Sequence, residues 1–229
     1  MNRKICLETA RLIIRDHRME DLPTHHAMLS DPEVMYYLPD IMTHSLEESR
    51  ADLAKAVTAV GRPGRREYFL RLEEKGTGEL VGEAGYTVLE ETPVGKLVHA
   101  GYFSRRKFWG RGYMTEAFRE ILRFAFEENG VYRLTTGCDP ENAGSERVMI
   151  KCGLIREADM KQKVWFDGRM HDRVEYRMLR EEWNLLRRSG AAGSLEDHKR
   201  GSVEDFASQK RSSHSCLPFR AFDNPLHMC

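Results

Sequence analysis

The chain has 229 residues, 41% of them apolar and 31% charged, which is enough for one domain with a sizeable core and barely enough for two. Lys and Arg number 36, as do Asp and Glu. The formal net charge of zero therefore gives no electrostatic reason to expect nucleic acid or an acidic membrane as a partner. The first residues lack the apolar run of a secretory signal, and no stretch approaches the ~18 apolar residues of a membrane-spanning helix.

The five cysteines are widely scattered and form no C-x-x-C pair: Cys6, Cys138, Cys152, Cys216 and Cys229. An odd, irregular set of this kind indicates neither a disulfide framework nor a zinc site. We therefore expect reduced thiols, a cytoplasmic location and no bound metal.

The first half of the chain contains short strands and two helices. A strand is expected at 11–16, and helical stretches at about 19–29 and from a capping box at 45–48, Ser-Leu-Glu-Glu. Two strands near 67–72 and 79–87 flank the turn at 75–78, and a third lies near 96–103.

The strongest helical pattern follows a basic, glycine-containing loop. Apolar residues from Met114 to Phe126 recur at i, i+3, i+4 and i+7, which predicts an amphipathic helix ending at Gly130. A strand at 132–138 and a short helix at 142–152 come next. Two final strands, 154–166 and 170–180, flank Asp167-Gly168, a strong hairpin signal. This order predicts an α/β fold with a mixed sheet and helices on both of its faces.

Beyond about residue 187 the composition changes. Ser, Gly, Lys and Arg dominate and the apolar residues follow no period. We expect residues 187–229 to form a disordered tail without a role in the chemistry.

The loop at 105–116 is the most informative segment, because it joins a strand to the amphipathic helix through Gly110-Arg111-Gly112. Free N–H groups at a helix N-terminus bind phosphate oxygens, and glycines let the backbone approach a ligand. Lys107 and Arg111 can add charge-assisted contacts. A purely structural alternative, a tight strand-to-helix turn whose charges face solvent, would explain the same residues. Neither G-x-x-x-x-G-K-[ST] nor a complete G-x-G-x-x-G is present.

A second segment, 142–154, begins with Asn142, a suitable N-cap. Ser145 lies three residues on, where its hydroxyl can point toward a ligand. Taken alone, the segment is also simply a well-capped helix.

Together the two segments resemble the GNAT acetyltransferase superfamily. Residues 107–112, Lys-Phe-Trp-Gly-Arg-Gly, resemble its pyrophosphate loop, and Asn142 with Ser145 resembles its Asn-x-x-Ser helix. The sequence of residues 109–117, Trp-Gly-Arg-Gly-Tyr-Met-Thr-Glu-Ala, is similar to that of the branch that includes ribosomal-protein N-terminal acetyltransferases. The resemblance covers about residues 8–183 and implies a mixed sheet of about seven strands with about four helices.

The resemblance also implies acetyl-CoA as co-substrate. The strand 101–104 would pair with the pantetheine arm, and Ser145 would protonate the leaving thiolate. The residues expected to contact acetyl-CoA are Phe103, Ser104, Lys107, Phe108, Trp109, Gly110, Arg111, Gly112, Tyr113, Met114, Thr115, Asn142 and Ser145.

Two residues are candidates for the general base. His99 alternates with Gly101 and Phe103 on one strand face, and an imidazole with a pKa of ~6.5 suits that role. It departs from the carboxylate that related sequences often carry there. Glu83, on the neighbouring strand, could act through water. Both residues also fit purely structural roles.

The acceptor pocket is expected between the first two helices (Tyr36, Tyr37, Leu38, Pro39) and the last hairpin (Trp165, Phe166). The resemblance implies a primary amine as acceptor, either of a small molecule or of a protein N-terminus, and the protein is expected to be a monomer or a homodimer. The alternative from another class is a non-catalytic acyl-CoA-binding module that regulates a partner.

Overall fold

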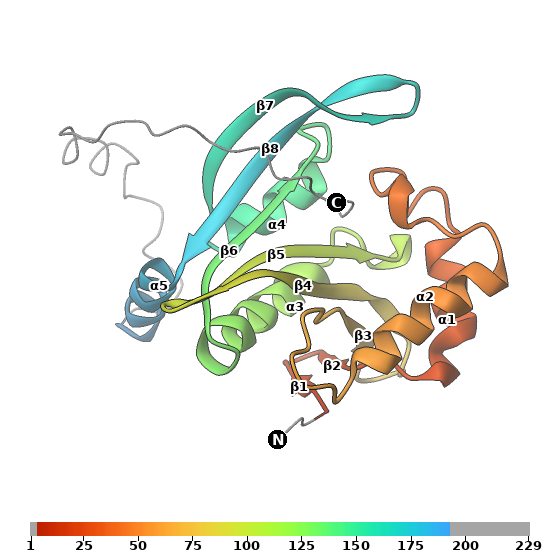
Figure 1. The fold of residues 1–229 in the computed structure, drawn as a ribbon, viewed down its shortest axis with the longest axis horizontal. Helices are drawn as coiled ribbons and strands as arrows, with labels where there is room; N and C mark the ends of the chain where they lie inside the picture. Colours follow the sequence, from red (N-terminus) through yellow and green to blue (C-terminus); the bar gives the residue numbers. More distant parts are fainter. Residues whose placement is uncertain (1–3, 193–229) are drawn as a thin grey trace.

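The computed structural model describes residues 4–192. One eight-stranded sheet forms its centre, with the strand order β1-β2-β3-β4-β5-β6-β8-β7 (Figure 1). The strands are β1 (Cys6–Glu8), β2 (Leu12–Arg15), β3 (Leu70–Glu74), β4 (Leu80–Thr92), β5 (Gly95–Ser104), β6 (Val131–Cys138), β7 (Ile155–Phe166) and β8 (Arg169–Leu179). The α-helices are α1 (Leu22–Leu29), α2 (Leu46–Ala59), α3 (Tyr113–Arg123), α4 (Ala143–Lys151) and α5 (Arg180–Ala192).

The sheet is mixed, as the sequence predicts. β5 and β6 run parallel, whereas the other neighbouring strands pair antiparallel. The expected α/β class is confirmed. Residues 4–192 contain eight strands rather than about seven, and five α-helices rather than about four.

Helices cover both faces of the sheet, because successive side chains of a strand point to opposite sides. On β5, Tyr102 packs against Phe118 of α3, and its hydroxyl reaches α4. Its neighbour Phe103 packs on the opposite face, against a buried cluster that includes Met28 of α1. Helices α3 and α4 therefore lie on one face, and α1 with α2 on the other (Figure 1).

The largest part of the core lies between α3 and the sheet. The apolar stripe predicted from Met114 onward is buried, with Ala117, Phe118, Ile121 and Leu122 fully inaccessible. The helix continues through a wider turn, Phe124–Glu128. Each large apolar side chain buried here contributes about 1.5–3 kcal/mol, which fixes α3 and the loop that precedes it.

Several predicted boundaries move. The first predicted helix begins as a short 3-10 turn, Met19–Asp21, before α1. β4 and β5 extend into a long hairpin that closes near residues 93–94. At the last hairpin, Asp167 and Gly168 adopt the positive φ values, 49° and 71°, that its turn requires.

Two elements were not predicted, β1 and α5. The predicted tail begins too early, because α5 continues through residue 187 to Ala192. Trp183 anchors this helix: it is buried and stacks on Phe126. The rest of the tail prediction, 193–229, lies outside the described residues.

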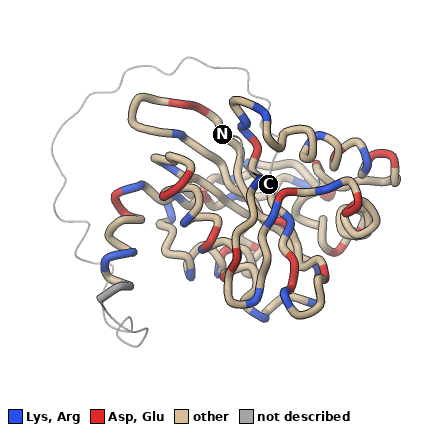
Figure 2. The backbone as a smooth tube through the Cα atoms, turned by 90° about the horizontal axis from the view of Figure 1, so that it is seen from below, with Lys and Arg blue, Asp and Glu red and all other residues tan. Residues whose placement is uncertain are grey.

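Among residues 4–192, no helix is both long enough and apolar enough to cross a membrane. Basic and acidic residues are interspersed along the chain rather than segregated (Figure 2), in keeping with the zero net charge.

Candidate active site

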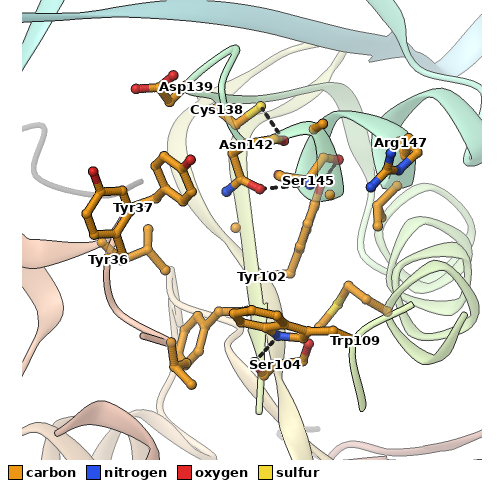
Figure 3. Close-up of a pocket in the computed structure, with 18 of the residues that line it drawn as sticks. Tyr36, Tyr37, Tyr102, Ser104, Trp109, Cys138, Asp139, Asn142, Ser145 and Arg147 are labelled. Carbon is orange, nitrogen blue, oxygen red and sulfur yellow. Dashed lines mark hydrogen bonds between the residues drawn. The ribbon is translucent and has the colours of Figure 1, made fainter. Parts of the chain in front are cut away.

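A cavity of about 910 Å³ opens at the C-terminal ends of β5 and β6. Its other walls come from the loop before α3, the first turn of α4, residues 32–38 and the β7–β8 hairpin (Figure 3). Of the residues predicted to contact acetyl-CoA or the acceptor, fourteen line it: Tyr36, Tyr37, Leu38, Phe103, Ser104, Phe108, Trp109, Gly110, Gly112, Met114, Thr115, Asn142, Ser145 and Phe166.

The cavity exists because β5 and β6 part. Their parallel ladder runs from Lys96 and Val131 to His99 and Thr135, and within residues 4–192 it ends there. The following residues of both strands, 101–104 and 136–138, line the cavity instead. On its other edge β5 stays paired with β4 as far as Ser104. Backbone N–H and C=O groups of β5 therefore face the gap, where an extended ligand arm can use them.

The glycine loop forms the wall next to α3. Gly110 and Gly112 have φ values of 70° and 77°, a region that other L-residues enter at a cost. Gly112 is the N-cap of α3, so the N–H groups of the first turn are free for an anion. Met114 and Thr115 of that turn line the cavity.

Of the basic residues of this loop, Arg106 lines the cavity, whereas Lys107 and Arg111, the two that the sequence suggested, do not. Lys107 forms an ion pair with Glu79, and the Arg111 guanidinium lies 5.3 Å from the centre of the Tyr113 ring. None of Lys107, Arg111 and Tyr113 lines the cavity. Arg147 and Lys151 of α4 line it instead. Their i, i+4 spacing was the available signal, because it places both on one helix face.

The first turn of α4 brings two hydroxyl groups together. The Asn142 side chain accepts a hydrogen bond from the Ser145 backbone N–H at 3.1 Å, which confirms the cap. The Ser145 hydroxyl donates to the Tyr102 hydroxyl at 3.1 Å, and the latter donates to the Ser145 carbonyl at 2.9 Å. Tyr102 also lines the cavity (Figure 3), although the sequence did not single it out.

Cys138, at the end of β6, also lines the cavity. Burial raises the pKa of its thiol to about 11. Because the thiolate is the nucleophilic form of cysteine, this side chain is a poor acceptor for an acyl group at neutral pH.

The opposite end of the cavity is aromatic. Tyr36, Tyr37 and Phe166 meet edge to face, with ring centres 4.8–6.3 Å apart. The Tyr36 hydroxyl donates to Asp167 at 3.2 Å, which links residues 32–38 to the last hairpin. Leu38 lines the cavity, whereas Pro39 and Trp165 do not. Trp165 is 67% exposed, on the outer side of its strand.

A carboxylate–histidine pair lies beside these aromatic rings. His171 donates from Nδ1 to Asp139 Oδ2 at 2.6 Å, and its ring stacks on Phe166 with 3.5 Å between centres. Both residues are buried, and Asp139 lines the cavity. The sequence analysis missed this pair, because 32 residues separate its members.

His99 lies where β5 and β6 separate. Its Nδ1 is 3.1 Å from the Thr135 hydroxyl. Burial, together with the charge of Arg173, lowers the pKa of His99 despite the opposing effect of Glu175. The imidazole is therefore neutral at pH 7. His99 does not itself line the cavity.

Glu83 lies elsewhere, in a buried cluster between His17 and His25. Burial opposes its ionisation, but the two histidines outweigh burial and hold the pKa of Glu83 far below its usual range. Such a carboxylate binds protons weakly at neutral pH. The structure does not bring Glu83 into the cavity.

Comparison with known proteins identifies the family. Residues 11–155 match the acetyltransferase (GNAT) domain. The chain belongs to the GNAT family of acetyltransferases. It is 31% identical over 187 residues to the uncharacterized N-acetyltransferase YnaD of Bacillus subtilis (strain 168), covering 78% of this chain and 99% of YnaD. This GNAT protein is therefore an acetyl-CoA-dependent acyltransferase that acts on amines, and the resemblance found in the sequence is confirmed.

Solved structures that share the fold include the following two. One is RimL, a ribosomal L7/L12 α-N-protein acetyltransferase in complex with coenzyme A. Its TM-score is 0.66 at 19% identity, with 76% of this chain and 98% of RimL covered. The other is the spermidine N-acetyltransferase from Vibrio cholerae in complex with CoA and spermine, with a TM-score of 0.66 at 16% identity, covering 77% and 99%.

Proposed function

We propose that this GNAT enzyme transfers the acetyl group of acetyl-CoA directly to a primary amine, with both substrates bound at once. The observation that carries the proposal is the opening between β5 and β6, which ends at the glycine loop and α3 on one side and at the aromatic residues on the other. Acetyl-CoA would occupy the first side and the amine the second.

Acetyl-CoA fits the first side in three places. Its pyrophosphate suits the free N–H groups at the start of α3, flanked by the two glycines. Its pantetheine arm suits the edge of β5 that faces the opening beyond the end of the β5–β6 ladder, where a backbone N–H can polarise the thioester carbonyl. Arg147 and Lys151 supply positive charge on α4 for the remaining phosphate oxygens.

The reaction forms an N–C bond and breaks a C–S bond. The neutral amine attacks the thioester carbonyl, the tetrahedral intermediate collapses, and CoA leaves as a thiolate. We assign protonation of that thiolate to Ser145, with Tyr102 as its hydrogen-bond partner. The raised pKa of Cys138 supports direct transfer over an acyl-cysteine intermediate.

The amine must also lose a proton. We propose that the Asp139–His171 pair accepts this proton. Asp139 lines the acceptor end of the cavity, and the hydrogen bond from His171 orients its carboxylate. A buried carboxylate beside tyrosine rings also suits a cationic amine before deprotonation. His99 is the second candidate, because it is neutral at pH 7 and lies where the two strands part.

The acceptor is either a small amine or a protein N-terminus. RimL and the spermidine acetyltransferase represent these two classes. The test measures free-thiol release from acetyl-CoA across a panel of polyamines, amino acids, aminoglycosides and ribosomal N-terminal peptides, with mass spectrometry of the product. We expect at least one amine to give thiol release matched by N-acetylation. If acetyl-CoA binds but every amine leaves its hydrolysis unchanged, the regulatory acyl-CoA-binding module is the better account.

A further inference from the structure

A second cluster of chemically active side chains lies away from the acetyl-transfer cavity. His17 follows β2, His25 belongs to α1, and Glu83 lies on β4. Their exposed fractions are 5%, 2% and 6%. One ligand-type atom from each lies within 4.8 Å of the others. The fold thus brings two imidazoles and a carboxylate from three separate segments into one buried site.

The contacts inside this cluster are unequal. His25 lies between two carboxylates, with Nδ1 2.8 Å from Glu83 Oε1 and Nε2 3.0 Å from Asp52 Oδ2. Neither ring nitrogen of His17 has a hydrogen-bond partner among the described residues. Its Nε2 lies 3.6 Å from Glu83 Oε2, and its Nδ1 lies 3.9 Å from Asp21 Oδ2. A buried polar group without a partner costs about 1–3 kcal/mol, so this arrangement needs an explanation.

Within the described part of the chain, the arginines near Glu83 do not form ion pairs with it. Arg15 and Arg71 lie close by, but they pair with Asp21 and Glu73. Among residues 4–192, the ion pairs of Glu83 are with His17 and His25. A buried carboxylate needs a compensating positive charge, and here that charge is either a proton on an imidazole or a metal ion.

The contact between His17 and Glu83 fits a metal ion, whereas the 2.8 Å between His25 Nδ1 and Glu83 Oε1 is a hydrogen-bond distance that would have to lengthen when an ion binds. In a tetrahedral zinc site, with bonds of about 2.0–2.1 Å, neighbouring ligand atoms lie about 3.4 Å apart. The 3.6 Å between His17 Nε2 and Glu83 Oε2 is too long for a good hydrogen bond but is close to this spacing. His25 also shows the usual outer contact of a metal-binding histidine, because its second nitrogen faces the Asp52 carboxylate.

We propose that His17, His25 and Glu83 bind one divalent transition-metal ion, zinc in particular, with Asp52 as the outer partner of His25. Two imidazoles and one carboxylate are a donor set that zinc accepts. The ion would join α1 and, through Asp52, α2 to β4. It would therefore brace the two helices on either side of residues 32–38, which line the acceptor end of the cavity, without contacting either substrate. The proposal departs from the expectation from the sequence that the protein binds no metal.

The test uses the full chain, freed of metal with a chelator and titrated with Co²⁺, followed by competition with Zn²⁺. We expect one equivalent of Co²⁺ to bind with the visible absorption of a nitrogen- and oxygen-ligated ion. Zn²⁺ should displace the Co²⁺ and raise the melting temperature above that of the metal-free protein. A thiolate-to-cobalt band would instead place the ion on cysteines, and the absence of stoichiometric binding would leave a shared proton as the explanation. Either result overturns the proposal.

Variants locate the site. His17→Gln should reduce Co²⁺ affinity at least 100-fold, and Asp52→Asn should reduce it by about 10–100-fold, the usual effect of losing an outer partner. His44→Gln is the matched control, because His44 is exposed and lies outside the cluster. Circular dichroism checks that each variant folds. Unchanged Co²⁺ affinity in folded His17→Gln would also overturn the proposal.

Discussion

The substitution Gly112→Asp tests the assignment of the glycine loop to acetyl-CoA. A Cβ at this position would lie 3.6 Å from Arg11 Nη2, so no clash is expected. The backbone at φ 77° adds about 1–2 kcal/mol of strain for a non-glycine residue. At the N-cap of α3, the new carboxylate would accept hydrogen bonds from the N–H groups that the pyrophosphate needs.

The loss in binding can be estimated from these contacts. One charge-assisted hydrogen bond is worth about 1.5–3 kcal/mol, and repulsion between like charges 4 Å apart adds about 1 kcal/mol in water and more near a protein surface. A total near 3 kcal/mol corresponds to a Kd on the order of 100-fold weaker.

Isothermal titration calorimetry with CoA measures this loss. Gly64→Asp is the matched control, because Gly64 has φ 70°, has no atom within 4 Å of an added Cβ, and lies outside the cavity. It should carry the same strain and retain wild-type affinity. Undiminished CoA binding in Gly112→Asp would refute the loop assignment.

Four further predictions follow from the site and the fold. Ser145→Ala should lower kcat by about 100-fold or less and leave CoA affinity unchanged. This is the low end for a general acid, because a thiolate leaves fairly well without protonation. Wild-type turnover would show that Ser145 is only a residue of helix α4 and has no role in catalysis. Asp139→Asn should lower kcat, and His99→Ala should leave the acid limb of the pH–rate profile in place; loss of that limb in His99→Ala would move the base to His99. Burial lowers the pKa of His99 in the folded protein, whereas in the unfolded chain this histidine titrates near ~6.5. Below that pH the unfolded chain therefore binds more protons than the folded protein, and the free energy of unfolding should fall. His99→Gln should flatten the resulting drop in melting temperature. A chain ending at residue 192 should keep its melting temperature and CoA affinity, because the sequence beyond lacks apolar periodicity, and a clear fall in either would contradict this.

Local patterns in the sequence predicted the parts of the site that local structure determines. Gly110 and Gly112 lie between a strand and a strongly amphipathic helix, and backbone geometry alone requires them there. Asn142 and Ser145 are three residues apart, so their cap is a property of one helical turn. The hairpin at Asp167-Gly168 is equally local.

Long-range contacts decide the rest. Lys107 is engaged by Glu79, which lies in the distant turn between β3 and β4. Glu83 is surrounded by histidines from other segments, and nothing in its own strand indicates this. The gap between β5 and β6 depends on a parallel register that joins segments about 36 residues apart. Helix α5 did leave a signal, because Trp183 and Leu186 share one face, but this pattern spans less than one helical turn.

The initial-rate pattern with two varied substrates tests direct transfer most directly. Thiol release would be measured while acetyl-CoA and the best acceptor amine are varied together. Direct attack in a ternary complex predicts double-reciprocal lines that intersect. Parallel lines, together with an acetylated protein isolated in the absence of amine, would show an acyl-enzyme intermediate. That result would contradict direct transfer between two substrates bound together in the β5–β6 cavity.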